Sequence, residues 1–133
     1  MQTLRTRLPN SPFDPIAAKT RLRVNGALGV KNRINMLFIA RFTDDANRLS
    51  VRQKFMSDHL QWLEQHRNAV LIAGSLRRET TGIPIGACWI VESESKEKVE
   101  ELLRTDPFWV QGLRQSVEVL HWVKAFPDRK APV

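Results

Sequence analysis

The chain has 133 residues, enough for one domain, and 42% hydrophobic with 26% charged residues is the composition of a soluble protein. One cysteine, Cys88, excludes an intrachain disulfide framework, and with three scattered histidines it offers no paired spacing for a zinc site. The sequence also lacks a Gly-rich phosphate loop and any apolar run of the roughly 18–20 residues that span a bilayer, so we expect no membrane segment, metal or cofactor.

The positive charge is concentrated at the N-terminus. The net charge is +7, and residues 1–35 hold seven Lys and Arg against one Asp, so the remaining residues are nearly neutral at +1. Prolines at positions 9, 12 and 15 interrupt residues 1–34, which show no sustained helical or strand period. We therefore expect residues 1–34 to form a basic, largely disordered arm outside the fold.

Three explanations of this arm remain open. It is an over-extended start, with Met36 as the true first residue, or an organelle-targeting peptide, or a nucleic-acid-binding tail. The targeting explanation is weakened because Ser11 is the only serine in the arm. Apart from this tail, nucleic acid is not an expected partner.

After residue 35, apolar runs and amphipathic stretches alternate at the lengths of strands and helices. Ser50 and Gln53 have the spacing of a capping box, in which each side chain satisfies the other's free backbone amide, and this predicts the start of the first helix. The predicted elements are a strand over 36–42, a helix over 51–66, strands over 69–76 and 85–92, a helix over 96–105 and a strand over 116–126. They predict a domain over 35–127 and a C-terminal tail over 128–133.

The order strand, helix, strand, strand, helix, strand predicts an α+β fold, a ferredoxin-like βαββαβ antiparallel sheet with both helices on one face. A sheet covered on one face only should alternate apolar and polar residues. The first strand instead carries Leu37 and Ile39 on the side opposite Phe38 and Phe42. Because no other part of the chain is left to cover the second face, we expect a homodimer through the sheet face, which is a dimeric α/β barrel.

His59 falls on the apolar face of the first predicted helix, between Phe55 and Trp62. One interpretation is a buried histidine whose ring nitrogens are satisfied by neighbouring polar groups. The other is a general acid or base, because histidine is the side chain that titrates near neutral pH without a perturbing environment. The second interpretation requires a partner that fixes the tautomer of the ring and stabilises its charged form.

Asp106 is the candidate partner. By itself, Asp106 followed by Pro107 is a good N-cap and first-turn pair for a short helical turn. We expect the strands that precede the two helices to be parallel, so the helices should also lie roughly parallel. His59, in the C-terminal half of the first helix, and Asp106, just beyond the second, should then lie near the same end of the helical layer. A carboxylate within hydrogen-bond reach would orient the imidazole ring.

Three further residues are candidates for binding a substrate. Gly74 inside an apolar strand indicates a bulge or a close backbone approach, although a kink at a sheet corner is equally consistent with it. Ser75 has a hydroxyl that would donate a hydrogen bond to a ligand, but no neighbour in the sequence activates it as a nucleophile. Trp109 follows Asp106 so closely that we expect it to line the same pocket.

These residues carry a resemblance to a known family. Residues 36–126 resemble the YciI-like (YCII-related) family of small dimeric α/β-barrel proteins, which is similar in fold to muconolactone isomerases. The matching pieces are "MLFIARF", "SVRQKFMSDHLQWL", "LIAGSL" and "TDPFWVQGLRQSVEVLHW". The resemblance implies that His59 and Asp106 form an active-site pair. Members more often have proline after the strand glycine, so Ser75 departs from the pattern.

The leading hypothesis is a small cytoplasmic homodimer in which His59 and Asp106 catalyse proton transfer. The reaction would be isomerisation or elimination on a small oxygenated, ring-shaped compound, without a cofactor. A non-catalytic small-molecule-binding or accessory domain is the alternative, and it would not need a titrating histidine. A cofactor-free monooxygenase also remains open, whereas RNA binding fits poorly because the third strand offers only Trp89 for stacking.

Overall fold

The structure is a computed structural model that describes residues 35–133. The predicted basic arm, residues 1–34, lies outside the described residues. By its internal contacts the described chain falls into two units, Met36–Trp122 and the terminal residues, which include Val123–Val133. Within residues 35–133 no helix has the length and apolar character needed to cross a membrane.

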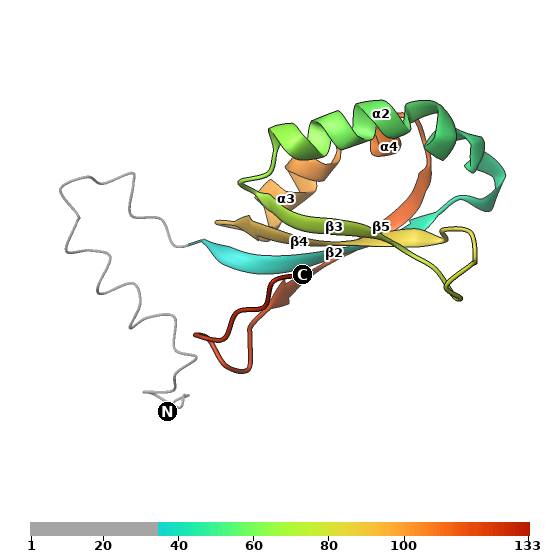
Figure 1. Ribbon diagram of the computed structural model, residues 1–133. Helices are drawn as coiled ribbons and strands as arrows, with labels where there is room; N and C mark the ends of the chain where they lie inside the picture. Colours follow the sequence, from blue (N-terminus) through green and yellow to red (C-terminus); the bar gives the residue numbers. More distant parts are fainter. Residues whose placement is uncertain (1–34) are drawn as a thin grey trace. The chain divides into compact units, whose positions relative to one another are not determined.

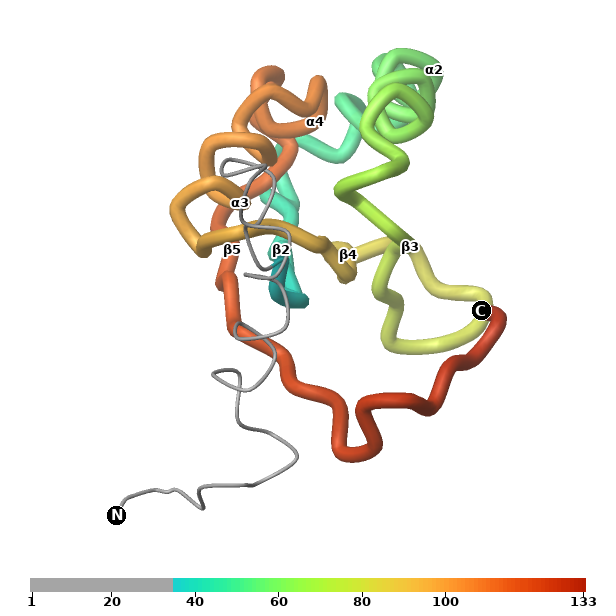
Figure 2. The backbone as a smooth tube through the Cα atoms, turned by 90° about the vertical axis from the view of Figure 1, so that its left-hand side faces the viewer, coloured from blue at the N-terminus to red at the C-terminus, as the bar shows by residue number. Residues whose placement is uncertain are grey.

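The unit Met36–Trp122 is a four-stranded sheet with all its helices on one face (Figures 1 and 2). The strands lie in the order β3-β4-β2-β5, and every neighbouring pair is antiparallel. In chain order the elements are β2 (Met36–Asp44), the 3-10 turn η2 (Ala46–Arg48), α2 (Ser50–Gln65), β3 (Val70–Leu76), β4 (Gly86–Ser93), α3 (Lys96–Leu103), α4 (Pro107–Val110) and β5 (Arg114–Trp122). This confirms the α+β, ferredoxin-like βαββαβ class, which is the subunit fold of dimeric α/β barrels.

The core lies between the sheet and the helices. Side chains of β2 alternate between the two faces, so Phe38, Ala40 and Phe42 are buried under the helices. Trp89 of β4 fills the space between them and α2. The predicted strand and helix positions are confirmed except at their ends, since α3 ends at Leu103 and β5 extends from Arg114 to Trp122.

The helices α2 and α3 run in opposite directions, so the prediction of parallel helices is wrong (Figure 1). β2 and β4, the strands that precede them, are antiparallel neighbours. In this topology the parallel strands are the two strands that one helix connects. The two strands that each lead into a helix are antiparallel, so the prediction failed.

Asp106 nevertheless reaches α2, because α3 is much shorter than α2. With 8 residues against 16, α3 ends beside the C-terminal half of α2, and the following turn and α4 continue along α2 toward its N-terminus. Trp62 Nε1 donates to Thr105 Oγ1 at 3.0 Å at the start of this path. Phe108 of α4 packs against Val51, in the first turn of α2. The chain therefore passes α2 in the antiparallel sense.

The predicted capping box at the start of α2 is absent. The N-cap residue is Leu49, which makes no side-chain capping bond, and its backbone is already helical at φ −64° and ψ −25°. A capping side chain acts from an extended backbone. Because η2 leads directly into α2, the extended capping residue lies earlier, at the start of η2. There the side chain of Asp45 accepts from the backbone amide of Asn47.

The close backbone approach predicted at Gly74 lies at Gly86. A Cβ atom added to Gly74 would meet nothing within 4 Å, whereas one added to Gly86 would lie 2.0 Å from the carbonyl oxygen of Phe42. The irregularity in β3 lies between Val70 and Ile72 and not at Gly74. Gly112, just before β5, has φ +82° and requires the conformational freedom of glycine.

The sheet face opposite the helices carries a row of apolar side chains from all four strands. Ile39 is the register partner of both Leu120 and Ile90, and Ile90 is also the partner of Ile72. Leu120 is 45% exposed and Trp122, two residues further along β5, is 37% exposed. We refer to Leu120, Ile39, Ile90 and Ile72 as the apolar row. This confirms that the second face carries apolar side chains, as the sequence predicted, although Arg41 and Glu118 form an exposed ion pair on the same face.

Candidate active site

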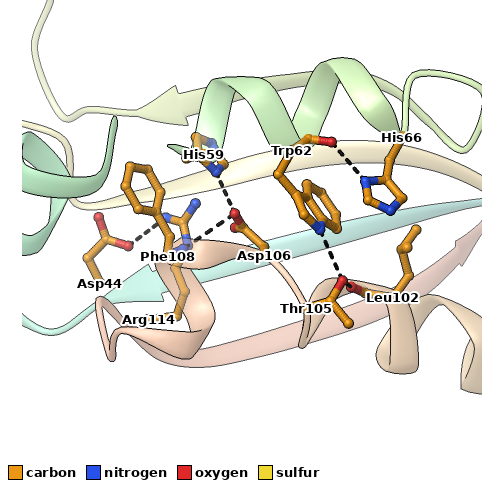
Figure 3. Close-up of polar contacts among 9 residues, drawn as sticks. All are labelled: Asp44, His59, Trp62, His66, Leu102, Thr105, Asp106, Phe108 and Arg114. Carbon is orange, nitrogen blue, oxygen red and sulfur yellow. Dashed lines mark hydrogen bonds and ion pairs between the residues drawn. The ribbon is translucent and has the colours of Figure 1, made fainter. Parts of the chain in front are cut away.

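His59 and Asp106 form a hydrogen-bonded pair inside the helical layer (Figure 3). His59 Nδ1 lies 2.7 Å from Asp106 Oδ1, across 47 positions of sequence. His59 is 7% exposed and Asp106 is fully buried. The predicted meeting of these two residues is confirmed, although they meet through the antiparallel path of α4 along α2.

Local structure holds Asp106 in place. It is the N-cap of α4, with an extended backbone, and its Oδ1 also accepts from the Phe108 backbone amide at 3.3 Å. Pro107 occupies the first helical position, where its missing N–H costs nothing. The predicted Asp-Pro cap is therefore confirmed. A single carboxylate caps α4 and holds the imidazole.

The hydrogen bond defines the tautomer of His59. An ionised carboxylate only accepts, so Nδ1 carries the proton and donates it to Asp106. In the neutral ring Nε2 is then unprotonated, and it makes no hydrogen bond with any residue in the range 35–133. An imidazole with its inner nitrogen held by a carboxylate and its outer nitrogen free is the arrangement of a general base.

The imidazole stacks on the ring of Phe108, with the ring centroids 4.0 Å apart and 15° between the planes. This contact and the hydrogen bond restrict the two rotatable bonds of the His59 side chain. Restriction of this kind keeps a catalytic group in one geometry and reduces the entropy lost when it acts.

A buried ion cluster that the sequence analysis missed adjoins the pair. Asp44, at the end of β2, accepts from Arg114 Nη1 at 2.8 Å and from Arg52 Nη2 at 2.6 Å. Burial lowers the pKa of the Arg114 guanidinium from its ordinary value, and the hydrogen bond to Asp44 opposes this effect. Both guanidiniums lie over the ring of Phe108, with Cζ 5.2 Å from the centroid for Arg114 and 5.3 Å for Arg52.

Two signals in the sequence pointed to this cluster. The alternation that buries Phe38, Ala40 and Phe42 continues to Asp44, which therefore faces inward and requires a partner. Arg52 precedes His59 by seven residues, which is two helical turns, so the two share a face. The position of Arg114 opposite Asp44 depends on the register of β2 with β5.

A cavity of about 220 Å³ opens beside His59. Gly74 and Ser75 line it, but Trp109 does not and packs instead against the core. Ser75 Oγ accepts from Arg77 Nε at 3.2 Å. The residues that line the cavity besides these are Arg52, Met56, Leu60, Leu63, Ala73, Arg77, Pro84, Ala87, Trp89 and Arg114.

A larger cavity of about 450 Å³ lies between β2 and the segment before β4. Its lining includes Arg41, Asp44, Arg78 and Pro84 but neither His59 nor Asp106. We assign the site to the smaller cavity, because that is where a free imidazole nitrogen meets an apolar wall. In residues 35–133 no three His, Cys, Asp or Glu side chains gather closely enough to hold a metal ion.

His66 has a structural position at the end of α2. It is the C-cap of α2, and its Nδ1 lies 2.8 Å from the carbonyl oxygen of Trp62, which also accepts from the His66 backbone amide. Its ring also stacks on Trp62 at 4.2 Å. His66 does not line the cavity beside His59.

Comparison with known proteins gives a family and a structural relative. The family model of the YCII-related domain matches residues 36–123. No curated protein matches the chain. Among solved structures, 5-chloro-2-hydroxyhydroquinone dehydrochlorinase (TftG) from Burkholderia phenoliruptrix AC1100, in complex with 2,5-dihydroxybenzoquinone, is similar, with a TM-score of 0.60 and 29% identity over 66% of this chain and 94% of that one.

A second solved structure is more distant. It is a candidate antibiotic biosynthesis monooxygenase from Bacteriodes thetaiotaomicron VPI-5482, with a TM-score of 0.48 and 16% identity over 74% of this chain and 96% of that one. The family match covers more than half of the chain and includes both residues of the buried pair. This protein belongs to the YCII-related domain family.

Proposed function

We propose that the protein is a cofactor-independent enzyme in which His59 moves a proton on a small oxygenated, ring-shaped compound. The observation that carries the proposal is the buried hydrogen bond between His59 Nδ1 and Asp106 Oδ1, which leaves Nε2 free beside a cavity. Gly74 and Ser75 would form the polar edge of the substrate site. Ser75 would bind substrate and not attack it, because its Oγ contacts Arg77 and no base.

The proposed step requires only these groups. His59 Nε2 takes a proton from a C–H or O–H bond of the substrate, and the Asp106 carboxylate stabilises the imidazolium that forms. The electron pair left on the substrate forms a double bond. If a neighbouring atom then loses a leaving group, the reaction is an elimination. If the imidazolium returns the proton to another atom, it is an isomerisation.

The structural relative supports this substrate class. That protein is a dehydrochlorinase of a chlorinated hydroxyhydroquinone, and its complex contains 2,5-dihydroxybenzoquinone, a small oxygenated ring. Loss of hydrogen and chloride is an elimination. A cavity of about 220 Å³ is below the size of drug-binding pockets and suits a single substituted ring.

The proposal is tested by offering the purified protein ring compounds of this class. We expect 2,5-dihydroxybenzoquinone to raise the melting temperature, since a ligand at 100 times its dissociation constant adds about 2.7 kcal/mol to the stability of the folded state. We expect release of chloride from 5-chloro-2-hydroxyhydroquinone, or conversion of a related ring compound to an isomer, followed by absorbance and mass spectrometry. Binding without turnover of any such compound would favour the non-catalytic binding module.

We further propose that the protein is a cytoplasmic homodimer through the apolar row on the open sheet face. The row joins all four strands, and exposed apolar surface of this kind marks an interface. Sedimentation should give twice the chain mass of 15.3 kDa. Leu120→Glu should give a monomer, whereas Val110→Glu, at a 61% exposed position on α4, should not change the mass. A wild-type monomer at micromolar concentration would exclude this interface.

A further inference from the structure

The charged residues that line the cavity beside His59 are all basic. They are Arg52, Arg77 and Arg114, and no Asp or Glu is among the lining residues. The rest of the lining is mainly apolar, with Met56 and Trp89 among its members. A small apolar cavity with three guanidiniums at its wall favours a ligand that is apolar over most of its surface and negatively charged at one edge.

The nearby carboxylates do not neutralise this charge. Asp44 is the hydrogen-bonding partner of both Arg52 and Arg114, so one negative charge serves two positive ones. Asp106 uses one oxygen, Oδ1, for both His59 and the cap of α4, and its Oδ2 is buried without a hydrogen-bond partner among the described residues. Arg77 donates to two neutral oxygens, Ser75 Oγ and the Gly82 carbonyl. Three guanidiniums therefore face two carboxylates, which leaves one positive charge in excess while His59 is neutral.

The two buried guanidiniums also have hydrogen-bonding capacity to spare. A guanidinium has five N–H donors, and each of these two arginines gives one hydrogen bond to Asp44. The Nε atoms of Arg52 and Arg114 are buried and have no hydrogen-bond partner among the described residues. The Arg114 side chain is only 1% exposed, so its positive charge is poorly compensated by water.

Phe108 keeps these charges close to the imidazole. His59 stacks on its ring, and Cζ of both Arg52 and Arg114 lies within 5.3 Å of the same ring centroid. Figure 3 shows His59, Phe108, Arg114 and Asp44 gathered in one region. A ligand whose charged atom meets the guanidiniums therefore presents neighbouring atoms to His59.

We infer that the substrate is a ring compound with a negatively charged oxygen, a phenolate, enolate or carboxylate, and that Arg52, Arg77 and Arg114 bind this oxygen while the apolar wall holds the ring. The inference rests on the proposed function where it calls the ligand a substrate, whereas binding of the anion does not depend on that function. When His59 removes a proton, negative charge develops on the conjugated oxygen, and guanidiniums fixed beside it lower the energy of that state.

Binding of a matched pair of probes tests the inference without turnover. Benzoate and benzamide have nearly the same shape, and only benzoate is charged. By calorimetry on the full chain at physiological ionic strength, we expect benzoate to bind at least tenfold more tightly than benzamide. Arg52→Gln should weaken benzoate binding at least tenfold and leave benzamide binding unchanged. Arg78→Gln, which removes an exposed charge outside this cavity, should change neither.

The outcomes separate this inference from the proposed function. Equal binding of the two probes, or an equal effect of Arg52→Gln and Arg78→Gln, would overturn the anion site even if a substrate is turned over. A preference for benzoate that depends on Arg52 supports the anion site even if no compound is turned over. If Arg52→Gln does not fold because Asp44 loses a partner, Arg77→Gln at an exposed position gives the same comparison.

Discussion

Replacing His59 by asparagine is expected to lower kcat about 10²–10⁴-fold on any compound that the protein turns over, since this is the usual contribution of a general acid or base. Asparagine keeps an N–H donor near the position of Nδ1, so the Asp106 carboxylate retains its partner. It removes Nε2, the ring nitrogen that Asp106 does not hold. The free energy of unfolding should fall by only about 0.5–3 kcal/mol, which is the ordinary range for one substitution.

The measurement combines steady-state kinetics with urea unfolding. His66→Asn is the matched control, because it removes a histidine of the same helix that contacts Trp62 and not the cavity. Its kcat should stay within about twofold of the wild type, less than the smallest effect expected of a catalytic group. A folded His59→Asn protein with unchanged turnover would show that His59 is a structural residue. Unchanged ligand affinity together with no turnover in the wild type would favour the binding module.

Asp106→Asn is expected to produce a loss of similar size, about 10²–10⁴-fold in kcat, with ligand binding retained. Asparagine is as good an N-cap as aspartate, so α4 should keep its start. The side chain loses the negative charge that stabilises an imidazolium. Its amide can also donate to Nδ1, and this would place the imidazole proton on Nε2, where a base must have none.

Asp58→Asn is the control for this variant. Asp58 is the sequence neighbour of His59 on α2, but its side chain is exposed and lies outside the cavity lining. It should leave kcat and the free energy of unfolding unchanged within error. If Asp106→Asn were as active as Asp58→Asn while His59→Asn was inactive, the carboxylate would be only the cap of α4. Asp106→Ala would then lower stability by about 1 kcal/mol through the lost cap, without an effect on catalysis.

Local patterns in the sequence predicted most of the fold. The apolar runs have strand length, and the residues around His59 recur at helical spacing, so the element order followed from periodicity. The Asp-Pro cap at residues 106–107 was also predictable, since it depends on two adjacent residues. The capping box predicted at Ser50 is absent, because the turn η2 leads into α2 with a backbone that is already helical at Leu49.

The site was only partly predictable. His59 stood out because a histidine on an apolar helix face requires a partner, and both the expected position of Asp106 and the resemblance to the YCII-related family pointed to Asp106. The predicted direction of the second helix was wrong, and the two residues meet because α3 is short. The arginines were missed because Arg114 reaches Asp44 across 70 positions, through a strand register that no local pattern specifies. Trp109 was misplaced because closeness to Asp106 in the sequence does not determine which way a side chain points from a four-residue helix.

The sequence by itself determined the elements, the fold class, the apolar second face of the sheet and the histidine that needed a partner. These features follow from burial and backbone propensity, which act over a few neighbouring residues. Only the tertiary structure decided the 2.7 Å contact of His59 with Asp106, the sharing of Asp44 by two arginines and the basic wall of the cavity. These contacts depend on helix length, strand register and helix direction together. Electrostatic contacts act over a few ångströms, and residues distant in the sequence come within that range only when every element is in place.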